Sequence, residues 1–337
     1  MNLLPLRTEI KLSASPHSIS YQTPALLLGS CFATHIGIRM EALKPPVLVN
    51  PFGVLYNPAS IGNSLGRLLA KQPFAESELY EHKGIWLSFA HHGSFAHTDR
   101  DRCRALVDES FVQAQIALRQ AHYLVITLGT AFAYRRKDTG DIVANCHQLP
   151  ATFFERKLLD IDDITAQWQP LLQGLRDCNP KLRIIFTLSP IRHWKDGAAD
   201  NQYSKAILTV AIRRLVAQNT QFCDYFPAYE LLMDDLRDYR FYETDMLHPN
   251  ETAIAYIWQK FGQCYLYHPD TQATMAAIQR VNAACQHRPR YPDSPAHRQF
   301  MGNMLVEARR LAMQYPHLDW SKELRYFEGV FKSDETK

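Results

Sequence analysis

The chain contains four apolar runs of strand length that are continuous rather than alternating. They read ALLLGS over residues 25–30, YLVITLG over 123–129, LRIIFTLSP over 182–190 and, more weakly, CDYFPAYE over 223–230. A strand that is apolar at nearly every position is covered on both faces, as in the parallel sheets of α/β proteins. The sequence therefore predicts a central sheet buried between two layers.

Helical patterns fill most intervals between these runs. Because strand and helix alternate along the chain, we expect a mostly parallel sheet with helices on both faces. Ligands of such open sheets bind beyond the carboxyl ends of the strands, and three runs end in the small polar triplets GSC, LGT and LSP. The expected helices cover residues 34–43, 60–70, 108–120, 161–176 and 203–218.

The last part of the chain has a different pattern. Two helical stretches, TQATMAAIQRVNAAC and AHRQFMGNMLVEARRLAMQ, are separated by HRPRYPDSP, which is rich in turn-forming residues. The sequence contains no low-complexity tract, internal repeat or long linker. We therefore expect an α/β domain over residues 1–264 and a helical extension over residues 265–337 that packs on it.

Composition and charge argue against several classes of protein. The net charge is only +3 over 337 residues, so it gives no reason to expect nucleic acid or an anionic membrane as a partner. Apolar runs are too short to cross a bilayer, and the start MNLLPLRTEIKLS lacks the pattern of a secretory signal. We expect a soluble, cytoplasmic protein, and the sequence does not indicate its oligomeric state.

The doublet Ser30-Cys31 stands where the first apolar run turns into a helical pattern. A cysteine at a helix start feels the positive end of the helix dipole and unpaired backbone amides, which favour the thiolate and can lower its pKa. Serine in that turn is also a good helix cap, and free cysteine is often simply buried. The doublet alone is compatible with catalysis or with an ordinary helix start.

A second motif, D-x-x-H-P-N, precedes a strongly amphipathic helix near residue 251. In such a turn Asp245 can orient the imidazole of His248, which leaves the other ring nitrogen to take a proton from a nucleophile. The alternative is that both residues merely cap the helix. By itself the spacing occurs often by chance.

Together these motifs resemble the SGNH (GDSL-type) hydrolase superfamily, in which a nucleophile follows the first strand and D-x-x-H-P precedes the last helix. GSCFA at residues 29–33 is identified with the motif that names the GSCFA-domain family, which is assigned to that superfamily. The resemblance implies a three-layer α/β/α sandwich with a mostly parallel, doubly wound, flavodoxin-like sheet. It continues through NPFGVLYNP (50–58), LGTAFAY (128–134), ANCHQLP (144–150), SPIRHWKDG (189–197), NQYSKA (201–206) and DLRDYRFYETDMLHPN (235–250).

The chain departs from the superfamily at the nucleophile. Aligning G-D-S with GSC places Cys31 at the nucleophile position and Ser30 at the position of the aspartate. A shift of one residue in the turn reverses the assignment, so both residues are candidates and Cys31 is favoured. A cysteine beside a histidine is a competent nucleophile at neutral pH.

The groups that bind the oxyanion also depart from the pattern. Gly53 matches the superfamily's second-block glycine, and its amide is expected to act together with that of the nucleophile. The third block keeps its glycine as Gly129 but has Ala131 at the position of the asparagine. Thr130 or Asn145 is the candidate replacement for this donor. A replacement matters because losing one such donor typically costs about 2.7–4 kcal/mol of transition-state stabilisation.

Further polar residues follow the expected strands or lie in the matching motifs. They suit an anionic or hydroxyl-rich substrate, although an internal salt bridge explains Arg192 equally well. Neighbouring histidines invite a metal site, but no H-x-x-x-H or carboxylate-rich pattern accompanies them, and the seven scattered cysteines lack a C-x-x-C pair. We therefore predict no metal and no organic cofactor. The candidate substrate-binding residues are His91, His92, His147, Arg192, His193, Lys205, Arg240 and Tyr242.

The resemblance implies an acyl-ester hydrolase or acyltransferase, with O-acyl carbohydrate or another small ester as substrate. Nothing in the sequence chooses between transfer to water and transfer to an acceptor alcohol. Two alternatives stay open at this point. One is a non-catalytic ligand-binding protein that keeps the fold, and the other is a thiol redox or scaffolding protein that uses Cys31 and Cys146.

Overall fold

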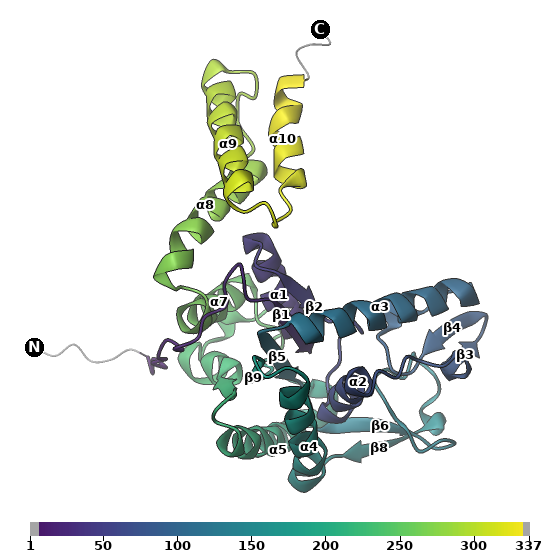
Figure 1. Ribbon diagram of the computed structural model, residues 1–337. Helices are drawn as coiled ribbons and strands as arrows, with labels where there is room; N and C mark the ends of the chain where they lie inside the picture. The colour runs from purple at the N-terminus through teal and green to yellow at the C-terminus, as the bar shows by residue number, and fades with distance from the viewer. Residues whose placement is uncertain (1–6, 333–337) are drawn as a thin grey trace, which may run out of the picture.

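A computed structural model describes residues 7–332, and its centre is a five-stranded parallel sheet with the order β10-β9-β5-β1-β2 (Figure 1). Numbered within this sheet alone, the order is 2-1-3-4-5, the flavodoxin-like doubly wound arrangement. The fold class predicted from the sequence is confirmed. The strands are β1 (Ala25–Gly29), β2 (Val47–Val49), β5 (Tyr123–Leu128), β9 (Arg183–Leu188) and β10 (Cys223–Phe226).

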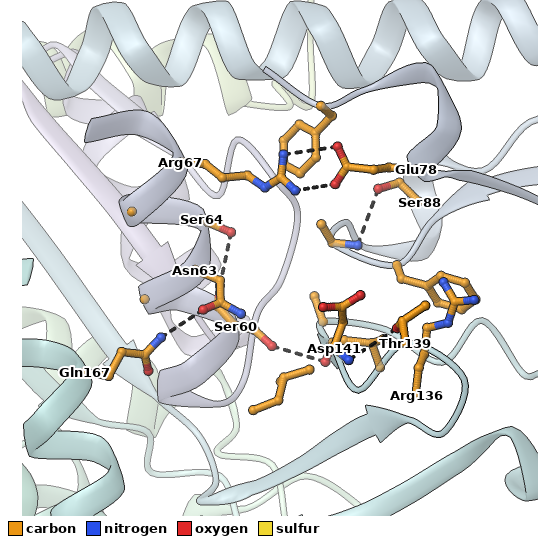
Figure 2. Close-up of a pocket in the computed structure, with 18 of the residues that line it drawn as sticks. Ser60, Asn63, Ser64, Arg67, Glu78, Ser88, Arg136, Thr139, Asp141 and Gln167 are labelled. Atoms are coloured by element: carbon orange, nitrogen blue, oxygen red, sulfur yellow. Dashed lines mark hydrogen bonds and ion pairs between the residues drawn. The ribbon is translucent and has the colours of Figure 1, made fainter. Parts of the chain in front are cut away.

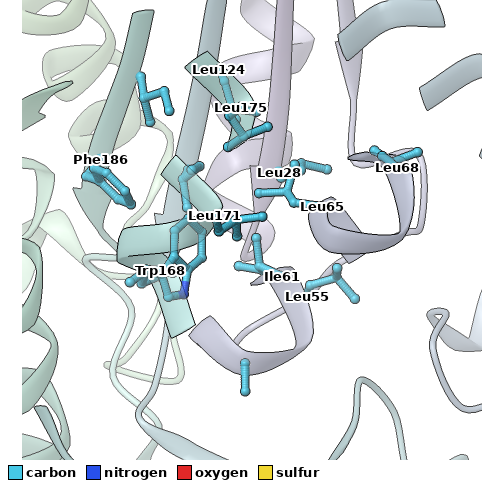
Figure 3. Close-up of a cluster of buried hydrophobic side chains, with 14 of the residues drawn as sticks. Leu28, Leu55, Ile61, Leu65, Leu68, Leu124, Trp168, Leu171, Leu175 and Phe186 are labelled. Carbon is cyan, nitrogen blue, oxygen red and sulfur yellow. The ribbon is translucent and has the colours of Figure 1, made fainter. Parts of the chain in front are cut away.

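Helices cover both faces of the sheet because each strand is apolar on both sides. In β1, Leu26 and Leu28 join the core beneath α2 to α5, whereas Ala25 and Leu27 join the core beneath α1 and α7. Figure 3 shows the first core, which contains leucines of α2 and α4 and the buried Trp168. The helices are α1 (Cys31–Leu43), α2 (Pro58–Ala70), α3 (Arg100–Gln120), α4 (Ile161–Cys178), α5 (Gly197–Gln218) and α7 (Glu251–Tyr265).

The turn from β1 into α1 requires a glycine. Gly29 pairs with Thr127 of β5 and has a φ of 142°, and a Cβ at Gly29 would lie 2.2 Å from the Thr127 carbonyl oxygen. That oxygen also accepts a hydrogen bond from the Ser30 amide at 3.1 Å. The close approach of the two strands therefore sets where the Ser30-Cys31 doublet emerges from the sheet.

Several short strands escape prediction from the sequence. β2 has three residues, and the others form an antiparallel hairpin and a three-stranded antiparallel sheet beside the main one. Runs such as FERKL carry too many charged residues for the hydrophobic pattern of a buried strand. These strands are β3 (Leu79–His82), β4 (Ile85–Ser88), β6 (Phe132–Arg136), β7 (Ile142–Val143) and β8 (Phe154–Leu158).

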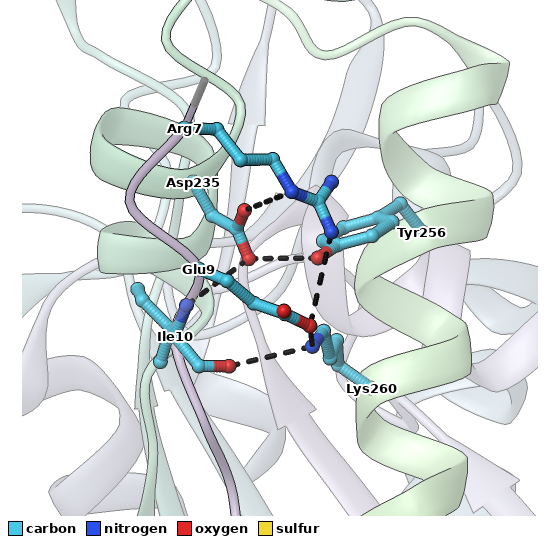
Figure 4. Close-up of polar contacts among 6 residues, drawn as sticks. All are labelled: Arg7, Glu9, Ile10, Asp235, Tyr256 and Lys260. Atoms are coloured by element: carbon cyan, nitrogen blue, oxygen red, sulfur yellow. Dashed lines mark hydrogen bonds and ion pairs between the residues drawn. The ribbon is translucent and has the colours of Figure 1, made fainter. Parts of the chain in front are cut away.

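The N-terminal segment is held against α7 by a polar network (Figure 4). The buried Asp235 carboxylate accepts hydrogen bonds from the Tyr256 hydroxyl at 2.7 Å and the Ile10 amide at 3.3 Å. Lys260 of α7 pairs with Glu9 at 3.0 Å. α6 (Ala228–Glu230) leads into the π-helix Leu231–Asp235, which carries the Asp235 carboxylate.

Three helices follow the α/β part: α8 (Pro269–Gln286), α9 (Pro295–Gln314) and α10 (Ser321–Lys332). In Figure 1 they rise from the end of α7, with α9 and α10 side by side and pointing away from the sheet. Buried residues of these helices continue the core of α1 and α7, and Lys44 at the end of α1 pairs with Glu323 of α10 at 3.0 Å. The boundary expected after residue 264 falls at the end of α7. Within residues 7–332, no helix has the length and apolar character needed to cross a membrane.

Candidate active site

A cavity of about 710 Å³ opens at the carboxyl ends of β1, β5 and β9. Ser30, Thr130 and Ser189, which follow these strands closely, all line it. The position is the point where the strand order reverses, between β1 and β5, which is the expected ligand site of this fold. Seven residues predicted from the sequence meet there: Ser30, Cys31, Thr130, Asn145, Arg192, His193 and His248.

The two residues of the doublet have different environments. Ser30 is the N-cap of α1, its hydroxyl accepts a hydrogen bond from the Phe32 amide at 3.3 Å, and the residue is 1% exposed. Cys31 is the first residue of α1 and is only partly buried. The serine hydroxyl is therefore engaged in capping, whereas the thiol is the more accessible group.

The ionisation of Cys31 does not follow the expectation from its helix position. Burial raises the pKa of the thiol above its usual value, although the amides of Cys31 and Phe32 and the ammonium of Lys205 act in the opposite direction. The effect of desolvation on the thiol pKa is therefore larger than the opposite effect of the amides at the start of the helix. The resting group is a neutral thiol, so it needs a base to become a nucleophile.

The turn before α7 places an imidazole in the same cavity. The Asp245 carboxylate lies 2.5 Å from Nδ1 of His248 and accepts two backbone hydrogen bonds at 2.9 Å, from Leu247 and from His248 itself. These amides, and then the imidazole, lower the pKa of Asp245 to about 2. An anionic partner keeps the proton on Nδ1, so Nε2 presents its lone pair.

The structure does not support Gly53 as an oxyanion donor. Its amide donates to the Asn50 carbonyl at 2.7 Å, and the residue is absent from the cavity lining. Gly53 has a φ of 74°, and a Cβ there would lie 2.2 Å from the Cβ of His92. The glycine is needed for a tight turn against the following segment.

Thr130 and Asn145 both line the cavity but differ in what they leave free. The Thr130 hydroxyl accepts from the Phe132 amide at 3.1 Å and is shared with Ser204 at 3.1 Å. The Asn145 side-chain oxygen Oδ1 accepts from the His147 amide at 2.7 Å, and its Nδ2 has no protein acceptor among residues 7–332. Asn145 is thus the better placed donor of the two.

Sequence reasoning missed Asn57, which lines the same cavity. Its side-chain oxygen caps α2 by accepting from the Ser60 amide at 2.8 Å, and the residue is 5% exposed. Its Nδ2 makes no hydrogen bond to any other part of the described chain. The signal in the sequence, an asparagine before a proline, is that of any helix cap, so nothing marked it as functional.

Tyr56, also missed, connects the cavity to the end of β5. Its carbonyl accepts from the amides of Gly129 at 2.7 Å and Thr130 at 3.1 Å, and its ring meets His193 edge-on at 5.3 Å. Burial, and then the nearby Cys31, raise the pKa of the phenol. The NPFGVLYNP segment therefore forms one wall of the site.

The segment after β9 contributes Arg192 and His193. The His193 amide donates to the side-chain oxygen of Asn201 at 2.9 Å, and burial, followed by the Lys205 charge, lowers the pKa of its imidazole to about 4. Arg192 forms no salt bridge with any described residue, and its buried Nε has no hydrogen-bond partner there. The salt-bridge explanation for Arg192 is therefore not supported.

Lys205 is beneath the cavity rather than on its wall. The residue is 1% exposed, and Nζ donates to the carbonyls of Gly129 at 2.8 Å and Ser189 at 2.7 Å. Burial, and then Arg192, lower the pKa of the ammonium to about 7. The structure does not support the predicted contact between Lys205 and a substrate.

Three other predicted residues, His91, His92 and His147, are absent from the cavity lining. His91 is buried among phenylalanine rings and pairs with the Ser88 hydroxyl at 2.8 Å. His92 follows it in a loop, where its ring pairs with the Ser94 hydroxyl. His147 anchors its loop to the Ser88 carbonyl through Nε2 at 2.9 Å. All three are structural in this arrangement.

Arg240 and Tyr242 lie on the outer side of the Asp245 turn. Arg240 is exposed, lies 3.7 Å from Asp238 and is absent from the cavity lining. Tyr242 lines a separate cavity of about 510 Å³, which Arg192 and Asp245 also border. Neither residue faces the thiol.

We expect the free energy of unfolding to depend on pH because two histidines, His91 and His193, are buried. Burial lowers the pKa of His91 to about 3 and that of His193 to about 4, so folding keeps both neutral while the unfolded chain binds protons below about pH 6.5. Their contribution is complete above that pH and is lost as the pH falls. We expect urea unfolding at pH 5 to show a loss of about 2 kcal/mol per histidine relative to pH 7.

The matched variants are His91→Phe and His92→Gln. The first should remove about half of the pH dependence, because one of the two buried imidazoles is gone while His193 remains, and the second controls for replacing a histidine in the same loop. Equal unfolding midpoints of the unsubstituted protein at pH 7 and pH 5 would contradict the prediction.

A second cavity, of about 680 Å³, lies on the other side of β7 and shares Val143 and Ala144 with the first (Figure 2). Its wall carries hydroxyl and amide groups of α2, and Arg67 is paired with Glu78. Ser88 reaches it and bonds His91, but no carboxylate in the described part of the chain orients that imidazole. The arrangement lacks the third group that the Asp245 turn supplies to the first cavity.

Fold and site together define an α/β protein with a thiol, an oriented imidazole and amide donors in one cavity. The model of the GSCFA family matches residues 24–261, and that of the GSCFA domain protein, C-terminal domain, matches residues 278–329. The chain belongs to the GSCFA family. Comparison with curated proteins found no match.

Three solved structures resemble the chain at low similarity. A carbohydrate esterase family 3 structure from Talaromyces cellulolyticus is 10% identical, and the match covers 75% of this chain and 98% of the esterase, with a TM-score of 0.32. A mutant acetyl esterase with acetate ion is 12% identical, with 77% of this chain and 99% of the esterase covered and a TM-score of 0.35. An acetyl xylan esterase from Butyrivibrio proteoclasticus is 11% identical, with 72% of this chain and 63% of the esterase covered and a TM-score of 0.36. Similarity at this level transfers neither activity nor substrate to this chain.

Proposed function

We propose that the protein is an acyl-ester hydrolase or acyltransferase with Cys31 as nucleophile and His248 as general base. The observation that carries the proposal is that Cys31 and the Asp245-oriented imidazole line one cavity at the strand ends. The resemblance to SGNH-type hydrolases supports the same reaction class. A neutral thiol and an imidazole with a free lone pair in one cavity are the groups that acyl transfer to sulfur needs.

The reaction proceeds in two halves. Nε2 of His248 takes the thiol proton as the sulfur of Cys31 attacks the ester carbonyl, and the carbonyl oxygen becomes an oxyanion. When the ester C–O bond breaks, the imidazolium returns its proton to the leaving alkoxide, which leaves a thioester on Cys31. Water, or an acceptor alcohol, then attacks the thioester with His248 again as base.

The oxyanion needs donors that do not have to move. We assign this role to the Cys31 amide at the start of α1 and to the Nδ2 groups of Asn57 and Asn145, because these groups line the cavity and the oxygen of each amide is fixed elsewhere. They take the place of the asparagine donor that is absent at position 131, which is Ala131, and of the Gly53 amide, which is already hydrogen bonded.

As substrate class we propose small O-acyl esters, with O-acylated carbohydrate as the first choice. The cavity wall carries amide groups and the half-exposed Trp194, which suit a polyhydroxylated ligand. Arg156 is paired with Asp196, so its charge is compensated. A screen of acetylated sugars, short-chain nitrophenyl esters and acyl thioesters tests the class directly.

An electrophilic ester probe with peptide mapping separates the proposed enzyme from its rivals. Labelling at Cys31 that disappears in His248→Ala supports catalysis, whereas no labelling between pH 6 and pH 9 favours a binding protein. A redox role requires thiols that ionise readily, yet burial raises the pKa of both Cys31 and Cys146, the latter to about 11. The thiol environment therefore favours acyl transfer.

Gly66→Leu tests which cavity holds the reaction. Gly66 lies in α2 on the wall of the second cavity, where a Cβ meets no atom within 4 Å. The leucine should occupy part of that cavity and stabilise the helix by about 1 kcal/mol, because glycine is a poor helix former. Ester turnover should not change. A loss of turnover in a stably folded Gly66→Leu would move the reaction to the second cavity.

A further inference from the structure

Lys205 is a completely buried side chain without a carboxylate partner, and burial lowers its pKa to about 7, so that it is a cation below that pH. It lies in α5 and is 1% exposed, and its Nζ donates hydrogen bonds only to the backbone oxygens of Gly129 and Ser189. Within residues 7–332 it forms no ion pair. Burying an unpaired ammonium is costly, so its presence requires a compensating interaction.

The two carbonyls place this cation at the floor of the catalytic cavity. Gly129 directly precedes Thr130, and Ser189 itself lines the cavity beside Ser30 and Cys31. Lys205 thus joins the ends of β5 and β9 at the edge where β1 delivers the doublet. Its charge acts on the cavity although its side chain does not reach the surface.

The groups that face the ammonium are mostly neutral or positive. Arg192 and His193 from the segment after β9, Tyr229 from α6 and Cys31 from α1 all interact with it. The Tyr229 hydroxyl donates to the side-chain oxygen of Gln202 at 3.1 Å. Cys31 is therefore the facing group that can become an anion during a reaction.

We propose that Lys205 is a positioning residue whose ammonium serves as the fixed counter-charge of the Cys31 thiolate that forms when His248 removes the proton. The positive charge is held by two carbonyls, so no reorganisation is needed when the negative charge appears. The catalytic part of this inference rests on the proposed function. Its electrostatic part concerns the thiol alone and is measured without any substrate.

The test is the pH dependence of Cys31 alkylation by iodoacetamide, followed by peptide mass spectrometry between pH 6 and pH 11. Lys205→Met should shift the alkylation profile, with a rate about tenfold lower at pH 6, where the ammonium carries its proton, and a difference that shrinks above pH 8 as burial makes the lysine lose it. Ser204→Ala is the matched control, since this buried neighbour hydrogen bonds the same loop at Ala131 and carries no charge. An equal shift in both variants, or no shift in Lys205→Met, overturns the proposal.

A second measurement keeps Lys205 intact, in case its replacement prevents folding. Cys31→Asp and Cys31→Asn differ only by a negative charge at the proposed position of the thiolate. We expect the aspartate variant to melt at the higher temperature. A negative charge at any helix start is stabilising, and the melting-temperature difference between the unsubstituted protein and Asp101→Asn measures that general effect at the start of α3. The difference between Cys31→Asp and Cys31→Asn should be larger than this reference difference. If Cys31→Asn melts at the same or a higher temperature, Lys205 is not a counter-charge.

These outcomes are separable from the proposed function. If no ester is turned over but alkylation shifts as expected, the cation still controls the thiol and the acyl-transfer proposal fails. If esters are turned over but neither measurement shifts, the acyl-transfer proposal stands and Lys205 is a structural link between two strands.

Discussion

Cys31→Ala is expected to lower ester turnover by about 10⁴-fold or more, because it removes the atom that forms the acyl intermediate. The rate should be measured as kcat/KM on a short-chain nitrophenyl ester. The fold should be unaffected, since Cys31 is only partly buried and alanine is a good helix former at the start of α1.

Ser30→Ala is the matched comparison. It removes the cap of α1, so we expect a loss of about 1 kcal/mol in stability with turnover largely kept. The reverse pattern, with turnover abolished in Ser30→Ala and retained in Cys31→Ala, would make the serine the nucleophile. Since Ser30 is 1% exposed, that result would also require the turn to open.

Asn57→Asp is expected to lower kcat by about 10²- to 10³-fold with little change in stability. Aspartate caps a helix as well as asparagine does, so the hydrogen bond from the Ser60 amide is kept, while the Nδ2 donor is replaced by a charged oxygen. Unfolding by urea and turnover of the same preparation measure the two effects separately.

Two further variants complete this experiment. Asn57→Ala should lose both the cap and the donor, and it therefore should cost stability as well as activity. Asn145→Asp tests the other amide in the same way, because its oxygen is held by the His147 amide. Unchanged kcat in Asn57→Asp together with a large loss in Asn145→Asp would assign the donor to Asn145 alone.

The arrangement of the sheet could be predicted because its signals are local. The continuous apolar runs of β1, β5 and β9 and the helices between them describe a parallel sheet in any context. β2 was missed because three residues carry too little pattern, and β8 because its exposed positions are charged. Neither omission changed where the strand ends meet.

The candidate site was only partly predictable. The Asp245 turn was predictable, since a spacing of three residues in sequence sets the carboxylate against the imidazole. The errors at Gly53 and Lys205 have one cause, which is that hydrogen-bond partners and burial come from segments distant in the chain. Asn57 was missed for the same reason. Its oxygen is an ordinary helix cap, and its Nδ2 group becomes a candidate donor only because the fold places it in the cavity with Cys31.

The sequence by itself determined the order of strands and helices along the chain and the carboxylate-imidazole pair, because each depends on neighbours a few residues away. Only the tertiary structure decided that Cys31 and His248 share a cavity, that the thiol rests protonated, and that a buried ammonium lies beneath it. These properties depend on desolvation and on contacts between α1, α5 and the turn before α7, which no single stretch of the chain contains.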